Sequence, residues 1–555
     1  MMKHFKLYLF SVFILATIEG KAQISPSPLR LPLSAAESKA GKIEADLHQH
    51  ERQDKFDNPT YRHWAYQNDS TGPKYSAVAY TTYSANATKG DFLPFEGNAG
   101  HDFRAGAQGS YSTAHSGTLA GTIQYARGKN KNISWNATRM PEDYFPYIST
   151  DSTGGDYQFD TYYAEGSYAF NLRRWIVGAK ASFHGEQAYR VSDPRALNNT
   201  TWLKFNAALS RILKGRLLMA QIGYARNKQH MQLRYWRPGE QNRFFVCYGF
   251  GLYDVRQSAV SFGKSRMYYI HQCNAKIQYI STAVKNWELH ASIGYAYEDM
   301  KTEESDIYNL YEARTRIITP LLDVTYQSHP RWKFALAARG RFKNWKGYEN
   351  IIEEYLIDKA NNIYDFRIID TQQNYNLQEQ QIDLTASAQH HFKNGMAWVQ
   401  GGTRMEFHEQ SYKNGNYMFN VRTQTPHAKV GASLFNDKNT VECSLLYGRQ
   451  ILGSHNYDVN LVNSLKPHLD FQHAFTPYAY RACELNLWAL DATYLRRFTK
   501  FAIGLNGRLC LEHGNRAEDA AYDKPIHFKS SAPLIQSMPD VHRSIWGATT
   551  LFVQF

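Results

Sequence analysis

Seven charged residues recur at alternating positions between residues 323 and 406, and they offer the clearest chemistry in the chain. Alternate residues of a strand share one face, so these side chains are expected to line one side of a sheet. Mixed charges on a pore wall set selectivity or hold a polar solute. The simpler alternative, which we favour, is a network of ion pairs in which these charges neutralise one another and bind no solute. The seven candidate pore-lining residues are Asp323, Lys333, Arg339, Arg341, Asp383, Arg404 and Glu406.

The short motifs of common enzymes do not occur in this chain. It has no GxSxG, HExxH, P-loop or dinucleotide-binding pattern. His390 and His391 are adjacent, so on a strand they point to opposite faces and cannot share one metal ion. His271 falls on an apolar, lipid-facing phase and has no identifiable serine partner. The sequence therefore predicts no enzyme, no catalytic residue, no metal site and no cofactor.

Long β-strands are the elements that must position the charges. Residues 332–342, 382–388 and 397–407 alternate apolar and polar side chains, and the final strand does so up to Phe555. These runs reach roughly 9–13 residues, the length that a tilted strand needs to cross a bilayer. Strands of a soluble sandwich average about 5–6 residues. A secreted sandwich or propeller remains an alternative, but the hairpins share a pattern and no repeated motif.

Tight turns alternate with long polar connections, as in outer-membrane barrels with short periplasmic turns and long extracellular loops. Eight hairpins plus one strand at each end predict an all-β, up-and-down antiparallel barrel of about 18 strands (16–20). The turns lie near residues 115–117, 172–174, 213–215, 285–286, 328–330, 393–395, 436–439 and 497–499. The long connections span about residues 86–100, 128–157, 186–200, 228–266, 298–313, 343–380, 409–423, 449–479 and 513–541. Tryptophans near the turns, which suit an interfacial girdle, are Trp175, Trp287, Trp332 and Trp398.

The chain begins with the pattern of a cleaved secretory signal peptide, residues 1–22. A basic start precedes an apolar stretch that ends in the small-residue approach Gly20-Lys21-Ala22. Residues 23–70 are polar and too short for the plug domain of a TonB-dependent receptor, so they could lie in the periplasm or in the lumen. Residues 71–555 form the predicted barrel.

Composition agrees with export to an outer membrane. Aromatic residues make up 14% of the chain, and the net charge is +13. Basic loops beside an anionic lipopolysaccharide surface or a cation-repelling lumen explain this charge equally well, whereas nucleic acid is a poor explanation for a secreted barrel. The cysteines show no disulfide or metal spacing. They are Cys247, Cys273, Cys443, Cys483 and Cys510.

The mature chain resembles the uncharacterised outer-membrane β-barrel proteins of Bacteroides-type bacteria. The resemblance rests on Lys21-Ala22-Gln23 at the signal end, on Asn58-Pro59-Thr60-Tyr61 before the first strand, and on the aromatic end of the last strand. It implies insertion by the barrel-assembly machinery, with Phe555, Val553 and Leu551 as the signal. It carries over no functional residues.

These observations predict a pore or transporter for a small polar or amphipathic solute. The alternative is an accessory or scaffold barrel whose long loops, chiefly 228–266 and 343–380, bind a surface or secretion partner. The expected partners are outer-membrane lipid and lipopolysaccharide, the barrel-assembly machinery and a possible surface or uptake-complex protein.

Overall fold

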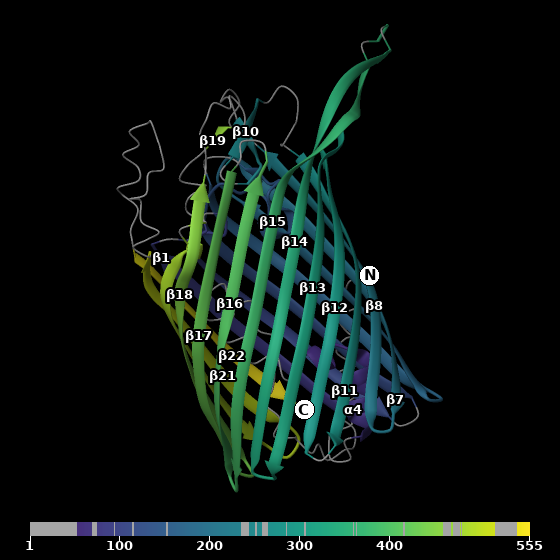
Figure 1. The fold of residues 1–555 in the computed structure, drawn as a ribbon, viewed down its shortest axis with the longest axis vertical. Helices are drawn as coiled ribbons and strands as arrows, with labels where there is room; N and C mark the ends of the chain where they lie inside the picture. Colours follow the sequence, from purple (N-terminus) through teal and green to yellow (C-terminus); the bar gives the residue numbers. More distant parts are fainter. Residues whose placement is uncertain are drawn as a thin grey trace, which may run out of the picture.

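Eighteen antiparallel strands close into one barrel in the computed structural model (Figure 1). Each strand pairs with its neighbours along the chain, and β1 pairs with β22 to close the wall. The predicted fold class and strand number are therefore confirmed. The structure describes residues 53–68 and 75–555, except 91, 94, 114–115, 151–153, 235–242, 250–251, 258–264, 285, 305–306, 359, 362, 414–416, 459–467, 470–477, 479 and 517–540. The predicted signal peptide and residues 23–52 lie outside this part of the chain.

The barrel strands are longer than a bilayer requires. They are β1 (Tyr75–Lys89), β2 (Ala99–Thr113), β3 (Gly117–Ile133), β5 (Gly155–Leu172), β6 (Trp175–Arg190), β7 (Arg195–Leu213), β8 (Arg216–Arg234), β11 (Ser265–Val284), β12 (Trp287–Glu304), β13 (Ile307–His329), β14 (Trp332–Asp358), β15 (Ile363–Phe392), β16 (Gly395–Tyr412), β17 (Tyr417–Phe435), β18 (Asn439–Asp458), β20 (Cys483–Arg497), β21 (Ala502–Arg516) and β22 (Val541–Gln554). The other elements are α3 (Gln53–Phe56), α4 (Pro59–Asn68), α5 (Pro141–Tyr144), and a small sheet of β4 (Ser149–Thr150), β9 (Arg243–Cys247), β10 (Leu252–Gln257) and β19 (His468–Leu469). No helix in the described ranges combines the length and the apolarity that a bilayer crossing needs.

The eight predicted tight turns all occur at one end of the barrel. Between β7 and β8, Lys214 and Gly215 both have positive φ, at 49° and 77°. Two consecutive residues with positive φ are typical of a type I′ turn, whose twist matches that of the flanking strands. The short-turn end is the periplasmic end of such a barrel.

At the opposite end, several predicted loops are strands, which corrects the sequence interpretation. The segment 343–380 continues β14 and β15 as a hairpin that projects beyond the barrel rim (Figure 1). The segments 186–200 and 298–313 are also mostly strand. Outside the membrane both faces of a strand can be polar, so hydrogen bonding continues where the alternating apolar signal has ended.

An apolar belt covers the outside of the barrel. Its side chains are more than a third exposed although they are large and apolar, which identifies the surface that faces lipid in an outer-membrane protein. Examples are Leu218, Ile222, Ile277, Ile293, Leu322, Leu336, Leu384, Val399, Val430, Leu445, Leu490, Leu505 and Leu551.

Three of the four tryptophans near the turns lie on this outer surface. Trp175, Trp287 and Trp332 are exposed beside their turns, as the girdle prediction requires. Trp398 is the exception, because it occupies the inward phase of β16, where its ring lies against Gly431. Successive side chains of a strand point to opposite faces, so a shift of one residue along the strand moves a side chain from the lipid face to the lumen.

The final strand forms the seam of the wall. Val553 and Leu551 pair with Ala79 and Thr81 of β1, and the Phe555 backbone exchanges hydrogen bonds with Ala77. The proposed role of this strand as an assembly signal stays a prediction.

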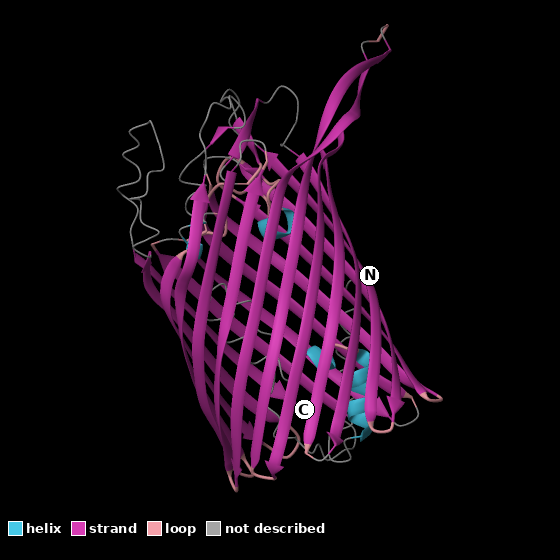
Figure 2. Ribbon diagram, viewed as in Figure 1, coloured by secondary structure: helices cyan, strands magenta, loops and turns pink. Residues whose placement is uncertain are grey.

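Two groups of elements occupy the interior (Figure 2). The helices α3 and α4 lie near the short-turn end. At the other end, α5 and β4 enter the barrel, and β4 pairs with β9 of the small sheet. The largest buried apolar cluster is also at this end, around Tyr144, Tyr147 and Tyr268.

Candidate functional site

The inward face of β14, β15 and β16 carries three successive rows of polar and charged side chains, here called the charge ladder. In each row the three residues are register partners across the three strands. The rows are Arg339, Asp383 and Arg404, then Arg341, Gln381 and Glu406, then Lys343, Glu379 and His408.

Two charged hydrogen bonds converge on Asp383 of the first row. Arg404 Nε donates to Asp383 Oδ1 at 2.6 Å, and Gln381 Nε2 donates to Asp383 Oδ2 at 2.7 Å. Arg404 is 6% exposed and Asp383 is 8% exposed. The Arg404–Asp383 pair therefore has the geometry of the ion-pair network that we favoured from the sequence.

Three of the seven predicted residues differ from this pattern. Lys333, Arg341 and Glu406 occupy inward positions, and none of them forms an ion pair within the described part of the chain. The Arg341 side chain is exposed to the lumen. These three charges are therefore the ones free to contact a solute, although their role as pore-lining residues stays a prediction.

The remaining predicted residue, Asp323, lies on β13 and is 7% exposed. It faces inward next to His290 of β12 in the register. The seven predicted residues thus do lie on four consecutive strands, β13 to β16, as expected.

Sequence reasoning missed the third row of the ladder. His408 Nδ1 lies 3.0 Å from Glu379 Oε1, and Lys343 Nζ lies 3.8 Å from Glu379 Oε2. Lys343 and Glu379 fall in the segment 343–380 that was interpreted as a loop. Extending the period-two pattern of residues 332–342 by one position would have placed Lys343 on the inward face.

A segment of the chain, residues 133–150, fills the extracellular end of the lumen and is here called the plug. Its backbone is held by Arg266 of β11, whose Nη1 donates to the Tyr147 carbonyl oxygen at 2.8 Å. The hydroxyl of Tyr268 donates to the same oxygen at 3.2 Å. Arg266 forms an ion pair with Glu304 of β12, and both side chains are at most 1% exposed. This pair anchors the plug to the wall.

Aromatic contacts add to the anchor. The Tyr147 ring stacks on Tyr311 at 4.8 Å, and the guanidinium of Arg266 lies 5.1 Å from the same Tyr311 ring. The ring of Tyr144 packs 4.4 Å from Tyr268, and its hydroxyl donates to Asn227 Oδ1 at 2.7 Å. Stacked aromatics and a desolvated cation–π contact each contribute favourably beyond the area that they bury.

The plug is part of a buried cluster that reaches most of the wall. Its members come from β3, β5 to β8 and β11 to β17 as well as from the plug and the small sheet. Tyr147 and Ile148 are fully buried within it. An 18-stranded barrel is too wide for its own wall side chains to fill, and this inserted segment occupies part of the interior together with the small sheet.

An acidic pair marks the short helix α5 of the plug. Asp143 is partly buried, and burial raises its pKa to about 7, with further contributions from the charges of Glu142 and Glu298. The cations Lys343 and Lys204 oppose this shift without cancelling it. The plug therefore holds a carboxyl group that titrates near neutral pH.

At the periplasmic end, α3 and α4 lie against one side of the inner wall. Asn58 caps α4, because its Oδ1 accepts a hydrogen bond from the Thr60 backbone N–H at 3.0 Å, and Pro59 occupies the first helical position. The segment Asn58-Pro59-Thr60-Tyr61 is thus a helix start.

Polar side chains of both helices bond to the wall. Lys55 Nζ donates to Glu288 of β12 at 2.7 Å, and His63 Nδ1 lies 2.8 Å from Thr118 Oγ1 of β3. Asn58 Nδ2 donates to Gln278 of β11 at 3.1 Å. Because these contacts reach β12 and none reaches the charge ladder, the described helices cover one side of the lumen and leave the ladder side open.

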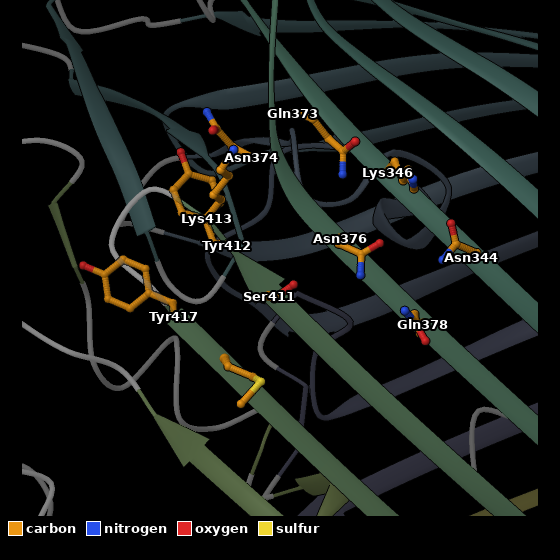
Figure 3. Close-up of a pocket in the computed structure, with 11 residues that line it drawn as sticks. Asn344, Lys346, Gln373, Asn374, Asn376, Gln378, Ser411, Tyr412, Lys413 and Tyr417 are labelled. Atoms are coloured by element: carbon orange, nitrogen blue, oxygen red, sulfur yellow. The ribbon is translucent and has the colours of Figure 1, made fainter.

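A polar groove of about 670 Å³ lies at the root of the projecting hairpin (Figure 3). It is lined by Asn344, Lys346, Asn376, Gln378 and Ser411, which occupy the outward phase of β14 to β16. It therefore belongs to the outer surface of the barrel and is separate from the lumen. Among the described residues no group of three metal-ligating side chains could hold a metal ion.

The closed wall, the apolar outer belt and the charged interior define an outer-membrane β-barrel protein. The chain belongs to a family of unknown function (DUF6850), whose model matches residues 70–529. The expectation of an uncharacterised family is confirmed at this level, and the Bacteroides-type origin stays a prediction.

Comparison with other proteins adds no functional information. No curated protein matches the chain. Solved structures with some similarity include the FrpB iron transporter from Neisseria meningitidis (9% identity, TM-score 0.38, covering 85% of this chain and 81% of that one). Another is the siderophore receptor PiuA from Acinetobacter baumannii (8% identity, TM-score 0.35, covering 85% and 81%). A third is the copper transporter OprC (10% identity, TM-score 0.35, covering 85% and 80%). Similarities this weak support no argument about this chain.

Proposed function

We propose that this protein is a gated outer-membrane transporter for a small polar or amphipathic solute, with the plug as its extracellular gate. The observation that carries the proposal is the plug itself, a segment of the wall's own chain that is inserted above a charged lumen. A barrel that served only as a scaffold would not need charged side chains such as Arg341 that a solute can contact in the lumen below the plug.

The plug has a feature of a gate because it is held to the wall mainly through side chains. Hydrogen bonds or ion pairs join it to Arg266, Tyr268, Asn227, Asn198 and Glu186, and its backbone pairs with a wall strand at Ile133. A segment attached in this way can detach without disrupting the barrel ladder, whose strands pair with one another independently of it.

Ion conductance of the purified full-length barrel in a planar bilayer tests this function. We expect the wild-type protein to be silent at about pH 5, where the plug is held closed, and a variant in which residues 137–150 are replaced by a Gly-Ser linker to open steadily. As a control, trimming residues 352–368 of the projecting hairpin removes a segment of similar length outside the lumen and is expected to leave the barrel silent.

A folded but silent linker variant would contradict a transport route through the lumen. It would favour the scaffold alternative, which one observation supports independently. The projecting hairpin exposes Ile351, Tyr355, Ile357 and Ile369 between 38% and 59%. Within the described part of the chain, β14 pairs with β13 only as far as Glu349 and β15 pairs with β16 only as far as Tyr375, so the outer edges of the hairpin have no strand partner beyond these residues. Exposed apolar side chains and open strand edges are typical of protein-binding surfaces.

A further inference from the structure

A row of polar and charged side chains, here called the cation row for its members Lys346, Arg314 and Arg226, crosses the outer surface just beyond the apolar belt. Lys346, Arg314, Asp299, His271 and Arg226 are successive register partners from β14 to β8, and all lie on the outward phase. Arg316 and Lys228 flank this row. Every Arg and Lys of the row is exposed. Asp299 and Glu312 are the acidic residues near Arg314, and both lie more than 3.5 Å from it.

Several of these cations lie over aromatic rings. Arg314 lies 4.7 Å from the Tyr348 ring, and Lys228 lies 5.7 Å from the Tyr269 ring. On the other side of the groove, Arg422 lies 4.8 Å from the Phe407 ring. Aromatic rings paired with long cationic side chains are typical of the interface between hydrocarbon and headgroups. The aromatic surroundings of these cations therefore suit the headgroup region of the outer leaflet.

The polar groove of Figure 3 lies at the end of this row, on the same outward face. Its carboxamides, from Asn344, Asn376 and Gln378, offer both donors and acceptors to hydroxyl groups. Lys346 lines the groove and is also the last cation of the row, and Lys413 lines its upper edge. The groove thus combines groups that suit sugar hydroxyls with groups that suit phosphate.

An apolar groove of about 560 Å³ lies on β13 to β16, deeper in the membrane belt. Leu322, Leu336, Leu384 and Gly401 line it. Gly401 keeps it open, because a Cβ there would have no neighbouring atom closer than 4.0 Å.

The two grooves are separated by the length of an acyl chain. Ala338 of the apolar groove and Asn344 of the polar groove are six residues apart on β14, which is about 20 Å along a strand. A strand tilted by about 40° converts this to roughly 15 Å of depth, half of a hydrocarbon core of about 30 Å. A lipid with its headgroup in the polar groove would therefore extend a chain into the apolar one.

We propose that β13 to β16 form a binding site for a phosphorylated, acylated glycolipid of the outer leaflet. The cation row and Lys346 pair with its phosphates, the carboxamides bind its sugar hydroxyls, and the apolar groove holds one acyl chain. A phospholipid supplies the charge and the chain but not the sugar ring that matches three neighbouring carboxamides. This site is independent of transport through the lumen.

Native mass spectrometry of the full-length barrel, titrated with rough lipopolysaccharide, tests the site. We expect the triple variant Arg314→Gln, Arg316→Gln, Lys346→Gln to bind on the order of 100-fold more weakly. Gly401→Leu, which fills the apolar groove, is expected to weaken binding several-fold while the barrel still folds. The matched control is the triple variant Arg174→Gln, Lys393→Gln, Lys438→Gln, which removes three exposed cations at the short-turn end.

Three further probes identify the chemistry that is recognised. Dephosphorylated and deacylated forms of the same glycolipid are expected to bind more weakly than the intact molecule, and phosphatidylglycerol more weakly again. Equal binding of phosphatidylglycerol would overturn the proposal, because it would show a general attraction to anionic lipid. Unchanged binding by the first triple variant, or an equal loss in its control, would overturn it as well.

Discussion

Replacing Glu304 with glutamine is expected to lower the free energy that holds the plug against the wall by about 3–5 kcal/mol. Arg266 and Glu304 are at most 1% exposed, so the substitution leaves a buried guanidinium without its counter-charge. Glutamine keeps the size of the side chain, which restricts the change to charge. Hydrogen exchange of the amides of residues 133–150 should therefore accelerate by about a hundredfold or more.

Two companion variants show whether burial is the cause. The exposed pair Arg367–Glu353 has an N–O distance of 2.7 Å, and its side chains are 62% and 47% exposed. Glu353→Gln is therefore expected to lower the free energy of unfolding by less than about 1 kcal/mol. The double variant Arg266→Met, Glu304→Leu should be close to neutral for overall stability, because both buried charges are removed together. A Glu304→Gln variant with wild-type exchange in the plug would refute the anchor.

The plug is also expected to detach more readily as the pH rises from about 5 to 8. Burial raises the pKa of Asp143 to about 7 in the closed structure, so the closed state holds a proton that a solvent-exposed Asp143 would release. Such a group favours closure at low pH, and this contribution disappears as the pH rises through the raised pKa. Between pH 5 and 8 the resulting change in the free energy of closure amounts to up to about 3 kcal/mol.

Open probability in the planar bilayer, recorded across this pH range, measures the effect. Asp143→Asn is expected to stay closed and to lose most of the pH dependence. Asp437→Asn, an exposed carboxylate at a short turn, should behave as the wild type. A barrel that opens at low pH, or an Asp143→Asn variant with the full pH dependence, would contradict this role.

The membrane-spanning wall could be predicted from the sequence because lipid imposes a strict alternation. The eight turns and the inward positions of Lys333, Arg339 and Arg341 follow directly from a period of two. Trp398 was misplaced because its position near a turn was given more weight than its phase, which it shares with Gln400 and Arg404.

The plug and its anchor could not be predicted from the sequence, because they depend on contacts between distant segments. Arg266 and Tyr147 are 119 residues apart, and nothing in either local sequence signals the other. The extended strands 343–358 and 363–380 were missed for a related reason. Beyond the membrane a strand no longer needs one apolar face, so its pattern resembles that of a polar loop. The anchor and the third row of the charge ladder therefore became visible only in the structure.

Labelling of a cysteine at position 341 shows whether the plug separates the charged lumen from the outside. In a background without the five native cysteines, Arg341→Cys would be treated on intact cells with a bulky, membrane-impermeant maleimide. Lys413→Cys, at the exposed rim, should react in every case and confirms that the protein is at the surface. We predict no reaction at position 341 in the otherwise wild-type barrel and rapid reaction once residues 137–150 are replaced by a linker. Rapid labelling at position 341 with the plug intact would show that the plug does not separate the lumen from the outside.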